Sequence, residues 1–177
     1  RSDPSFADAM TWLRRLAGEQ QQRRATPATP HDLVVLFNRA PLTTAAMALL
    51  LFCSASRHAD VWAMQAQMSS NDVLCIQMGP FKSDTQQQHN MHKFITAPPP
   101  WAALFQAIIE NPVPYERFVQ EIRAAVPSLT AHSFRRGAVT LLSETHQLEQ
   151  IQLLTGHAPT SIVSRALTRY VDPHPSQ

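Results

Sequence analysis

The sequence predicts an α+β fold, a mainly helical domain with a small antiparallel β-hairpin or sheet. Apolar residues recur at helical spacing through most of the chain. Residues 73–78 have the length and the β-branched content of a strand, and Gly79-Pro80 then turns the chain. Residues 92–96 are the expected hairpin partner. With 177 residues, the chain is long enough to bury one sizeable core.

Four helices are expected before the hairpin. Residues 5–24 carry apolar side chains four and three positions apart. Residues 31–38 form a short helix, and residues 42–53 are so apolar that their helix is expected to be buried on most sides. Residues 57–66 are expected to form a further helix, with its apolar positions directed inward.

The helices expected after the hairpin are marked mainly by their ends. Residues 101–110 start directly after three prolines, a favoured arrangement for a first turn. Residues 114–126 carry apolar side chains one turn apart. Thr130 is the expected N-cap of residues 131–143, Gly156 is the expected end of residues 147–154, and residues 159–169 form the last helix. The expected core face of the helix at 131–143 consists of Phe134, Ala138, Leu141 and Leu142.

A proline-rich stretch divides the chain into two parts. Residues 25–30, Ala-Thr-Pro-Ala-Thr-Pro, are typical of a linker. The expected division therefore falls between residues 1–30 and residues 31–177. The first residues lack the apolar stretch of a signal peptide, and the start without Met suggests a piece of a longer protein.

The composition limits the class of protein. No apolar run approaches the ~20 residues that a membrane helix needs, so no membrane partner is expected. Cys53 and Cys75 both lie in apolar segments and are expected to be buried free thiols. The net charge is only +2, but thirteen of the fifteen basic residues are arginine, and the lysines are Lys82 and Lys93. Arginine binds phosphate with a planar two-pronged donor set, whereas lysine gives up a proton more readily.

The chemistry-bearing residues gather toward the C-terminus. His132-Ser133-Phe134-Arg135-Arg136-Gly137 places a histidine and an arginine three apart, on one helix face. Arg136 lies about 100° further round that helix and is not expected in the same site. Gly156-His157 and Tyr170 follow. Cations that hold a phosphate, imidazoles that move protons and a phenol that attacks are the groups that phosphoryl transfer through a tyrosine requires.

The stretch from His132 to Tyr170 resembles the C-terminal signature of the tyrosine recombinases, the integrase family of phage, Xer-type and mobile-element enzymes. The family has an arginine followed three residues later by an acidic residue, and Arg57 and Asp60 fit this pattern. It also has a lysine in a β-hairpin turn, and Lys82 lies 25 residues beyond Arg57 (82 − 57 = 25). The resemblance covers roughly residues 31–172 and fills six positions in order.

The resemblance implies a role for each of these residues. Arg57 and Arg135 would bind the scissile phosphate, with Asp60 supporting Arg57. Tyr170 would attack, and its phenol, with a pKa of about 10, needs help to lose its proton. That help would come from His132 as base or proton relay.

Two further roles follow from the same resemblance. His157 would hydrogen-bond the phosphate. Lys82 would protonate the departing 5′ oxygen, with Lys93 as the alternative acid. No metal is expected, because His89 and His92 lack the further ligands that zinc requires. No nucleotide cofactor is expected either, because the resemblance implies that the phosphotyrosyl link keeps the energy of the broken bond.

Each residue alone also has an ordinary structural explanation. Arg57 could be a surface arginine at a helix start, Arg135 a solvent-facing one, and Tyr170 an aromatic anchor. Each histidine could be a cap or a satisfied core residue, and Lys82 a flexible turn lysine. Only the ordered set favours catalysis. A type IB topoisomerase and an inactive DNA-binding module derived from a recombinase are the alternative functions.

The expected activity is site-specific cutting and rejoining of double-stranded DNA through a 3′-phosphotyrosyl link. Within that resemblance, residues 1–30 are the end of an N-terminal DNA-clasping domain with its linker, and residues 31–177 are the catalytic domain. Residues 132–140 look closest to mobile-element members, which implies a transposon or retroelement integrase. It would assemble as a tetramer on DNA, in the nucleus for a eukaryotic element and otherwise in the cytoplasm.

The tyrosine spacing departs from the commonest family pattern. Most members place the tyrosine about nine residues after the last His or Trp of the block, whereas here the gap is thirteen (170 − 157 = 13). The longer gap resembles the yeast flippase class, in which the tyrosine enters a neighbour's active site. Delivery of Tyr170 in trans is therefore a hypothesis.

Overall fold

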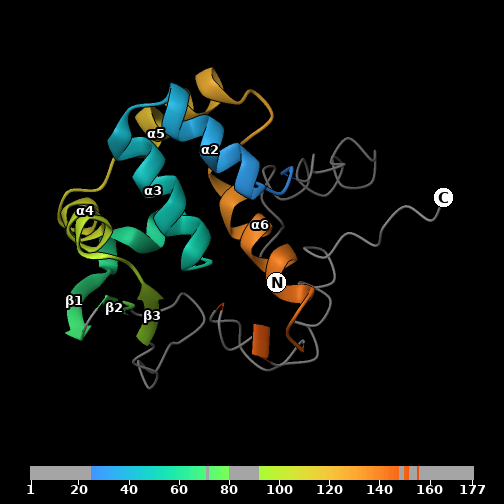
Figure 1. Ribbon diagram of the computed structural model, residues 1–177. Helices are drawn as coiled ribbons and strands as arrows, with labels where there is room; N and C mark the ends of the chain where they lie inside the picture. Colours follow the sequence, from blue (N-terminus) through green and yellow to red (C-terminus); the bar gives the residue numbers. More distant parts are fainter. Residues whose placement is uncertain (1–24, 71, 80–91, 148–149, 152–154, 156–177) are drawn as a thin grey trace, which may run out of the picture.

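The structure, a computed structural model, describes residues 25–70, 72–79, 92–147, 150–151 and 155 (Figure 1). The described elements are, in order, α2 (Pro30–Arg39), α3 (Leu42–Cys53), the 3-10 helix η1 (His58–Ala63), β1 (Gln65–Ser70), β2 (Val73–Gln77), β3 (His92–Thr96), α4 (Pro99–Glu110), α5 (Tyr115–Ala125) and α6 (Ala131–Ser143). The α+β prediction, a mainly helical domain with a small antiparallel sheet, is confirmed.

Helix α3 lies at the centre of the described helices. It contacts α2, α4, α5 and α6, and its side chains from Thr44 to Phe52 are buried on most sides, as its sequence predicts. On the far side of α3 from α2, Figure 1 shows the sheet close to α4, with α6 running along the opposite flank. The loop that leaves α3 therefore lies between the sheet and α6.

The sheet has three strands rather than the two of a hairpin. The order is β1-β2-β3, and both pairs are antiparallel. The prediction of a helix at residues 57–66 holds only as far as Ala63, where the 3-10 helix η1 ends. The chain then enters β1 at Gln65. Pairing of β1 with β2 supplies main-chain hydrogen bonds that a local helix pattern does not reveal.

Helix α6 begins at the predicted cap. The backbone N–H of Thr130 donates to Ser133 Oγ at 2.9 Å. Phe134 is fully buried, its ring 5.8 Å from that of Phe118, and Ala138 is buried as predicted. Leu141, expected in the core, is exposed, because the buried stripe of α6 passes through Val139 instead.

The predicted linker packs on α6 along its described part. The Ala28 N–H donates to the Ser133 carbonyl at 2.9 Å, and Arg136 Nη1 donates to the Ala25 carbonyl at 3.0 Å. A Cβ at Gly137 would lie 1.9 Å from the Ala28 oxygen, so glycine is required for this close approach. Residues 25–29 are thus held by α6, while the expected helix at residues 5–24 lies outside the described residues.

Two other expectations concern cysteines and membranes. Cys53 is exposed and Cys75 is half-buried, so the prediction of two buried thiols is wrong. Cys53 is the last residue of α3, and it escapes burial because the chain turns away immediately after it. None of the helices in the described ranges is long and apolar enough to span a membrane.

Candidate active site

The turn after α3 presents Arg57. Ala55 has a left-handed backbone, with φ of 48°, which is unfavourable for a residue with a Cβ. Ser54 Oγ donates to the Leu50 carbonyl at 2.6 Å and closes the helix end. Arg57 is exposed and stands directly before η1. The side chain that the motif assigns to phosphate binding is therefore accessible from solvent in the described structure.

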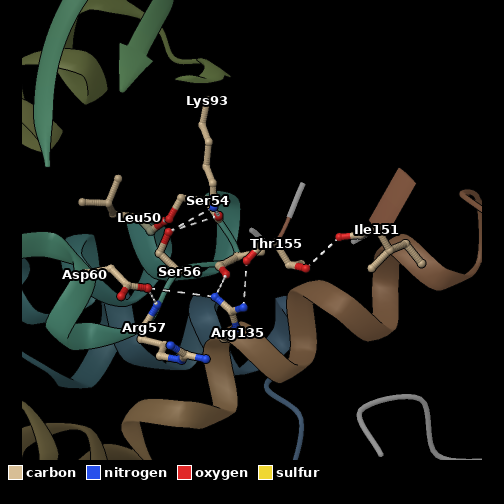
Figure 2. A network of polar contacts seen from close by, with 10 residues as sticks. Leu50, Ser54, Ser56, Arg57, Asp60, Lys93, Arg135, Ile151 and Thr155 are labelled. Carbon is tan, nitrogen blue, oxygen red and sulfur yellow. Dashed lines mark hydrogen bonds and ion pairs between the residues drawn. The ribbon is translucent and has the colours of Figure 1, made fainter. Parts of the chain in front are cut away.

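Asp60 connects the two predicted phosphate-binding arginines. Its Oδ2 accepts the backbone N–H of Arg57 at 2.7 Å and lies 4.0 Å from Arg135 Nη1 (Figure 2). The first contact fixes the start of η1, and the second joins η1 to α6. Asp60 thus supports Arg57 through the main chain.

Arg135 is buried, with 3% of its surface exposed, and this excludes the interpretation as a solvent-facing helix residue. Its Nη1 donates to the Ala55 carbonyl and its Nη2 to the Thr155 carbonyl, each at 2.8 Å. Figure 2 shows the guanidinium between these two segments. A buried charge requires such partners, and here they join the turn before Arg57 to the segment that leads to His157.

Lys93 lies on the other side of the same turn. It reaches from β3 and donates to the Ser54 carbonyl and, at 3.2 Å, to Ser56 Oγ. Burial and the positive charge of Arg135 lower its pKa to about 7, while Asp60 acts in the opposite direction. An amine with this pKa exchanges protons readily near neutral pH.

His132 stands at the start of α6, near both arginines. Its burial lowers the pKa of the imidazole, and the charges of Arg135, Arg57 and Arg136 lower it further. The neutral ring is therefore favoured at neutral pH. A neutral imidazole can accept a proton, as a general base must.

The structure thus brings Arg57, His132 and Arg135 together. Lys82, His157 and Tyr170 lie outside the described residues, so their expected positions stay predictions. Thr155, two residues before His157 in sequence, is tied to Arg135.

Sequence reasoning missed the structural part of the network, which consists of Ser54, Ser56, Lys93 and Thr155. It had named Lys93 only as an alternative acid. The alternation of side chains along β3 could have indicated that Lys93 points inward, because Lys93 shares a strand face with the buried Ile95. The bonds from Lys93 join β3 to a turn some 40 residues earlier in the chain, and no local pattern predicts such a contact.

A pocket of about 520 Å³ adjoins the exposed arginine. Three segments form it, namely η1 with the residue before it, the start of α5 and the start of α6. The lining residues are Arg57, His58, Ala59, Trp62, Pro114, Tyr115, Glu116, Ala131 and His132. Across the described ranges, no three His, Cys, Asp or Glu side chains gather as metal ligands would.

The fold is similar to that of a solved recombinase. XerH site-specific recombinase, in a post-cleavage complex with palindromic DNA, matches with a TM-score of 0.51 at 14% identity, covering 84% of this chain and 50% of that one. A pre-cleavage complex of XerH matches with a TM-score of 0.48 at 14% identity, covering 81% and 50%. No protein-family model and no curated protein matches the chain.

The first of these matches defines the class of fold as that of the tyrosine recombinase XerH. The chain spans half the length of the XerH chain. At 14% identity the likeness concerns the fold, and the chemistry must be argued from the side chains of this chain.

Proposed function

We propose that the chain is the catalytic domain of a tyrosine recombinase that cuts and rejoins DNA strands. The observation that carries the proposal is the proximity of His132 to Arg57 and Arg135, the two arginines that Asp60 connects. These residues come from two segments about 75 positions apart in sequence, and they meet in the order that the motif requires. Two cations and a neutral imidazole at one place suit the charge that develops on a phosphodiester under attack.

In the proposed reaction, the Tyr170 oxygen attacks phosphorus while His132 accepts the phenolic proton. The P–O bond to the 5′ oxygen breaks, and a 3′-phosphotyrosyl link forms. The exposed Arg57 binds a non-bridging oxygen. Arg135 contributes its positive charge, and its bond to the Ala55 carbonyl holds the turn that carries Arg57. Because the new phosphotyrosyl ester retains the energy of the broken phosphodiester bond, religation requires no nucleotide.

The departing 5′ oxygen needs a proton. We assign this role to Lys82 from the motif. Lys93 is bonded to the Ser54 carbonyl and to Ser56 Oγ, which makes it a support for the turn before Arg57. The lowered pKa of Lys93 also suits an acid near neutral pH, so only an experiment on both lysines can decide which of them is the general acid.

Double-stranded DNA is the proposed substrate. The structural neighbour XerH is described in complex with a palindromic DNA site, and palindromy is typical of sites bound by symmetric assemblies. From the family resemblance of the motif residues, we propose assembly on DNA as a tetramer. The mobile-element origin, and with it a nuclear or cytoplasmic location, is proposed from residues 132–140 alone.

Covalent capture tests the proposal. The full 177-residue protein is incubated with nicked duplexes of randomised sequence, in which the fragment beyond the cut diffuses away. The expected product is an adduct that resists denaturant. Tyr170→Phe should abolish it while leaving DNA binding intact, and Leu141→Ala, at an exposed position of α6 outside the pocket, is the control and should form the adduct.

Other outcomes separate the alternatives. An adduct that persists in Tyr170→Phe removes Tyr170 as the nucleophile. Adducts at many unrelated sequences, with relaxation of supercoiled DNA, indicate a topoisomerase. DNA binding without any adduct indicates an inactive binding module.

A further inference from the structure

The pocket beside Arg57 contains two large aromatic side chains that the fold leaves in the open. Trp62 is 61% exposed and Tyr115 is 54% exposed. Both line the same pocket, although they come from η1 and from the start of α5. Exposed aromatic side chains that converge on a cavity are typical of a recognition site.

Both rings are carried by fixed elements. The Tyr115 ring lies edge-on against the His58 ring at 5.2 Å, and His58 Nε2 is hydrogen-bonded to the Val113 carbonyl at 2.9 Å. Trp62 belongs to η1, whose first turn is closed by Asp60. The Tyr115 ring, held in place before binding, loses little entropy when a flat ligand packs against it.

The charges in the pocket select the kind of ligand. Arg57 and His132 line it together, and the proposed function assigns both to the scissile phosphate. Glu116 adds a carboxylate close enough to His58 to act on its charge. A phosphate is attracted to Arg57 and repelled by Glu116, whereas Glu116 can accept hydrogen bonds from amino groups. A ligand with an anionic end and a flat end that carries N–H donors meets all these requirements.

Resting on the proposed function, we infer that this pocket binds one unstacked nucleotide of the DNA, next to the phosphate held by Arg57 and His132. The base packs against Trp62 and Tyr115, and Glu116 accepts from its amino group. A volume of about 520 Å³ is within the size range of small-molecule pockets. Stacking of bases on aromatic side chains is the common way in which proteins hold unpaired nucleotides.

Trp62 and Tyr115 have no role in strand cleavage itself, but an unstacked base would pack against both. Removal of a nucleotide from the stack opens the DNA at the cut. Enzymes that extract a base hold it by stacking and by hydrogen bonds to its edge. Adenine, cytosine and guanine each present an amino group and thymine does not, so the pocket should favour the first three.

Mononucleotides test the pocket without knowledge of the DNA target. The full chain is titrated with deoxycytidine 5′-monophosphate, thymidine 5′-monophosphate, 2-deoxyribose 5-phosphate and inorganic phosphate. Binding is followed by the NMR signal of the Trp62 indole N–H, assigned by its loss in Trp62→Phe. From the strength of stacking on aromatic side chains, the cytidine nucleotide should bind about five- to a hundredfold more tightly than the sugar phosphate.

The variants locate the effect. Trp62→Ala and Tyr115→Ala should each lower the affinity for the nucleotide to that for the sugar phosphate. In these variants, binding is measured from the chemical-shift changes of neighbouring backbone amides. Tyr115→Phe keeps the ring and should keep the preference. Phe94→Ala is the control, because Phe94 is an aromatic residue with 67% exposure on β3 that does not line the pocket. Glu116→Gln should narrow the difference between cytidine and thymidine nucleotides.

Equal affinities for all four phosphates in the wild-type protein would overturn the inference, as would no binding at all or a preference that survives Trp62→Ala. These results are separable from failure of the proposed function. Normal covalent capture without a base preference rejects the pocket alone. A base preference that requires Trp62, without any covalent capture, rejects the recombinase activity alone.

Discussion

Asp60 Oδ2 lies 4.0 Å from Arg135 Nη1 and, at 2.7 Å, also accepts the backbone N–H of Arg57. One carboxylate oxygen therefore sets the start of η1 relative to α6. Arg135 in turn donates to the carbonyl of Ala55, in the turn that leads to Arg57. The position of Arg57 thus depends on two contacts, one from its own backbone N–H to Asp60 and one from Arg135 to the carbonyl of Ala55. Misplacement of a reacting group by about 1 Å can cost roughly a hundredfold in rate.

Asp60→Asn should therefore slow covalent capture by roughly a hundredfold, from misplacement of Arg57. The amide keeps the size of the carboxylate but loses its charge, so the free energy of unfolding should fall by about 1–3 kcal/mol. Rates of adduct formation and denaturant unfolding measure the two effects. Glu144→Gln, an exposed acid at the end of α6, is the control and should change neither quantity. A rate in Asp60→Asn equal to that of the wild type would contradict the positioning role.

Lys93 should make stability depend on pH above neutrality. Burial and Arg135 lower its pKa in the folded state to about 7 from 10.5, so the unfolded chain binds more protons between these values. The free energy of unfolding should therefore rise with pH in this window, by up to about 1.4 kcal/mol per pH unit. The cost of the buried ammonium is fully present below about pH 7.

Denaturant unfolding at about pH 7 and about pH 8.5 measures this slope. Lys93→Met should lose it, whatever its absolute stability. The window avoids His132, whose pKa is lowered from 6.5 and which therefore contributes below that pH. An unchanged slope in Lys93→Met would show that the amine titrates normally.

The two lysines should respond differently to the leaving group. Lys82→Ala should slow cleavage of ordinary DNA by about 10²–10⁴-fold, since a general acid typically contributes that much. A 5′-bridging sulfur leaves without protonation and should restore the rate. Lys93→Met should be slow with both substrates, because it loses support of the turn at Ser54 and Ser56 rather than an acid. Rescue of Lys93→Met by sulfur, and not of Lys82→Ala, would transfer the acid role to Lys93.

Gly137→Ala should destabilise the protein, although alanine is the better helix former by about 1 kcal/mol. The new methyl group would lie 1.9 Å from the Ala28 carbonyl oxygen and 2.9 Å from Phe52 Cε2. Overpacking of this kind costs about 1–3 kcal/mol, so the midpoint of denaturation should fall. Leu141→Ala, at an exposed position of α6, should change stability by about 0.5 kcal/mol or less. A stabilised Gly137→Ala would show that residues 25–29 are free to move away from α6.

The sequence by itself determined the elements whose signals are local. Residues 42–53 are predominantly apolar and form α3, and the strand at 92–96 is predicted to the residue. Thr130 is the N-cap residue of α6 as expected, and its backbone N–H donates to Ser133 Oγ. The three-residue spacing places His132 and Arg135 on one face of the helix. Each of these features depends on side chains within a few positions of one another.

Only the tertiary structure decided where distant segments meet. It ended the helix expected at 57–66 at Ala63 and placed the following residues in β1, because β2 offers β1 a partner for its main-chain groups. It also tied Arg135 to Ala55 and Thr155, two carbonyls far apart in sequence. Such contacts form because a buried charge or an unpaired N–H must find a partner wherever the packed chain supplies one. Spacing along the chain can identify the arginines, but only packing determines which main-chain groups hold them.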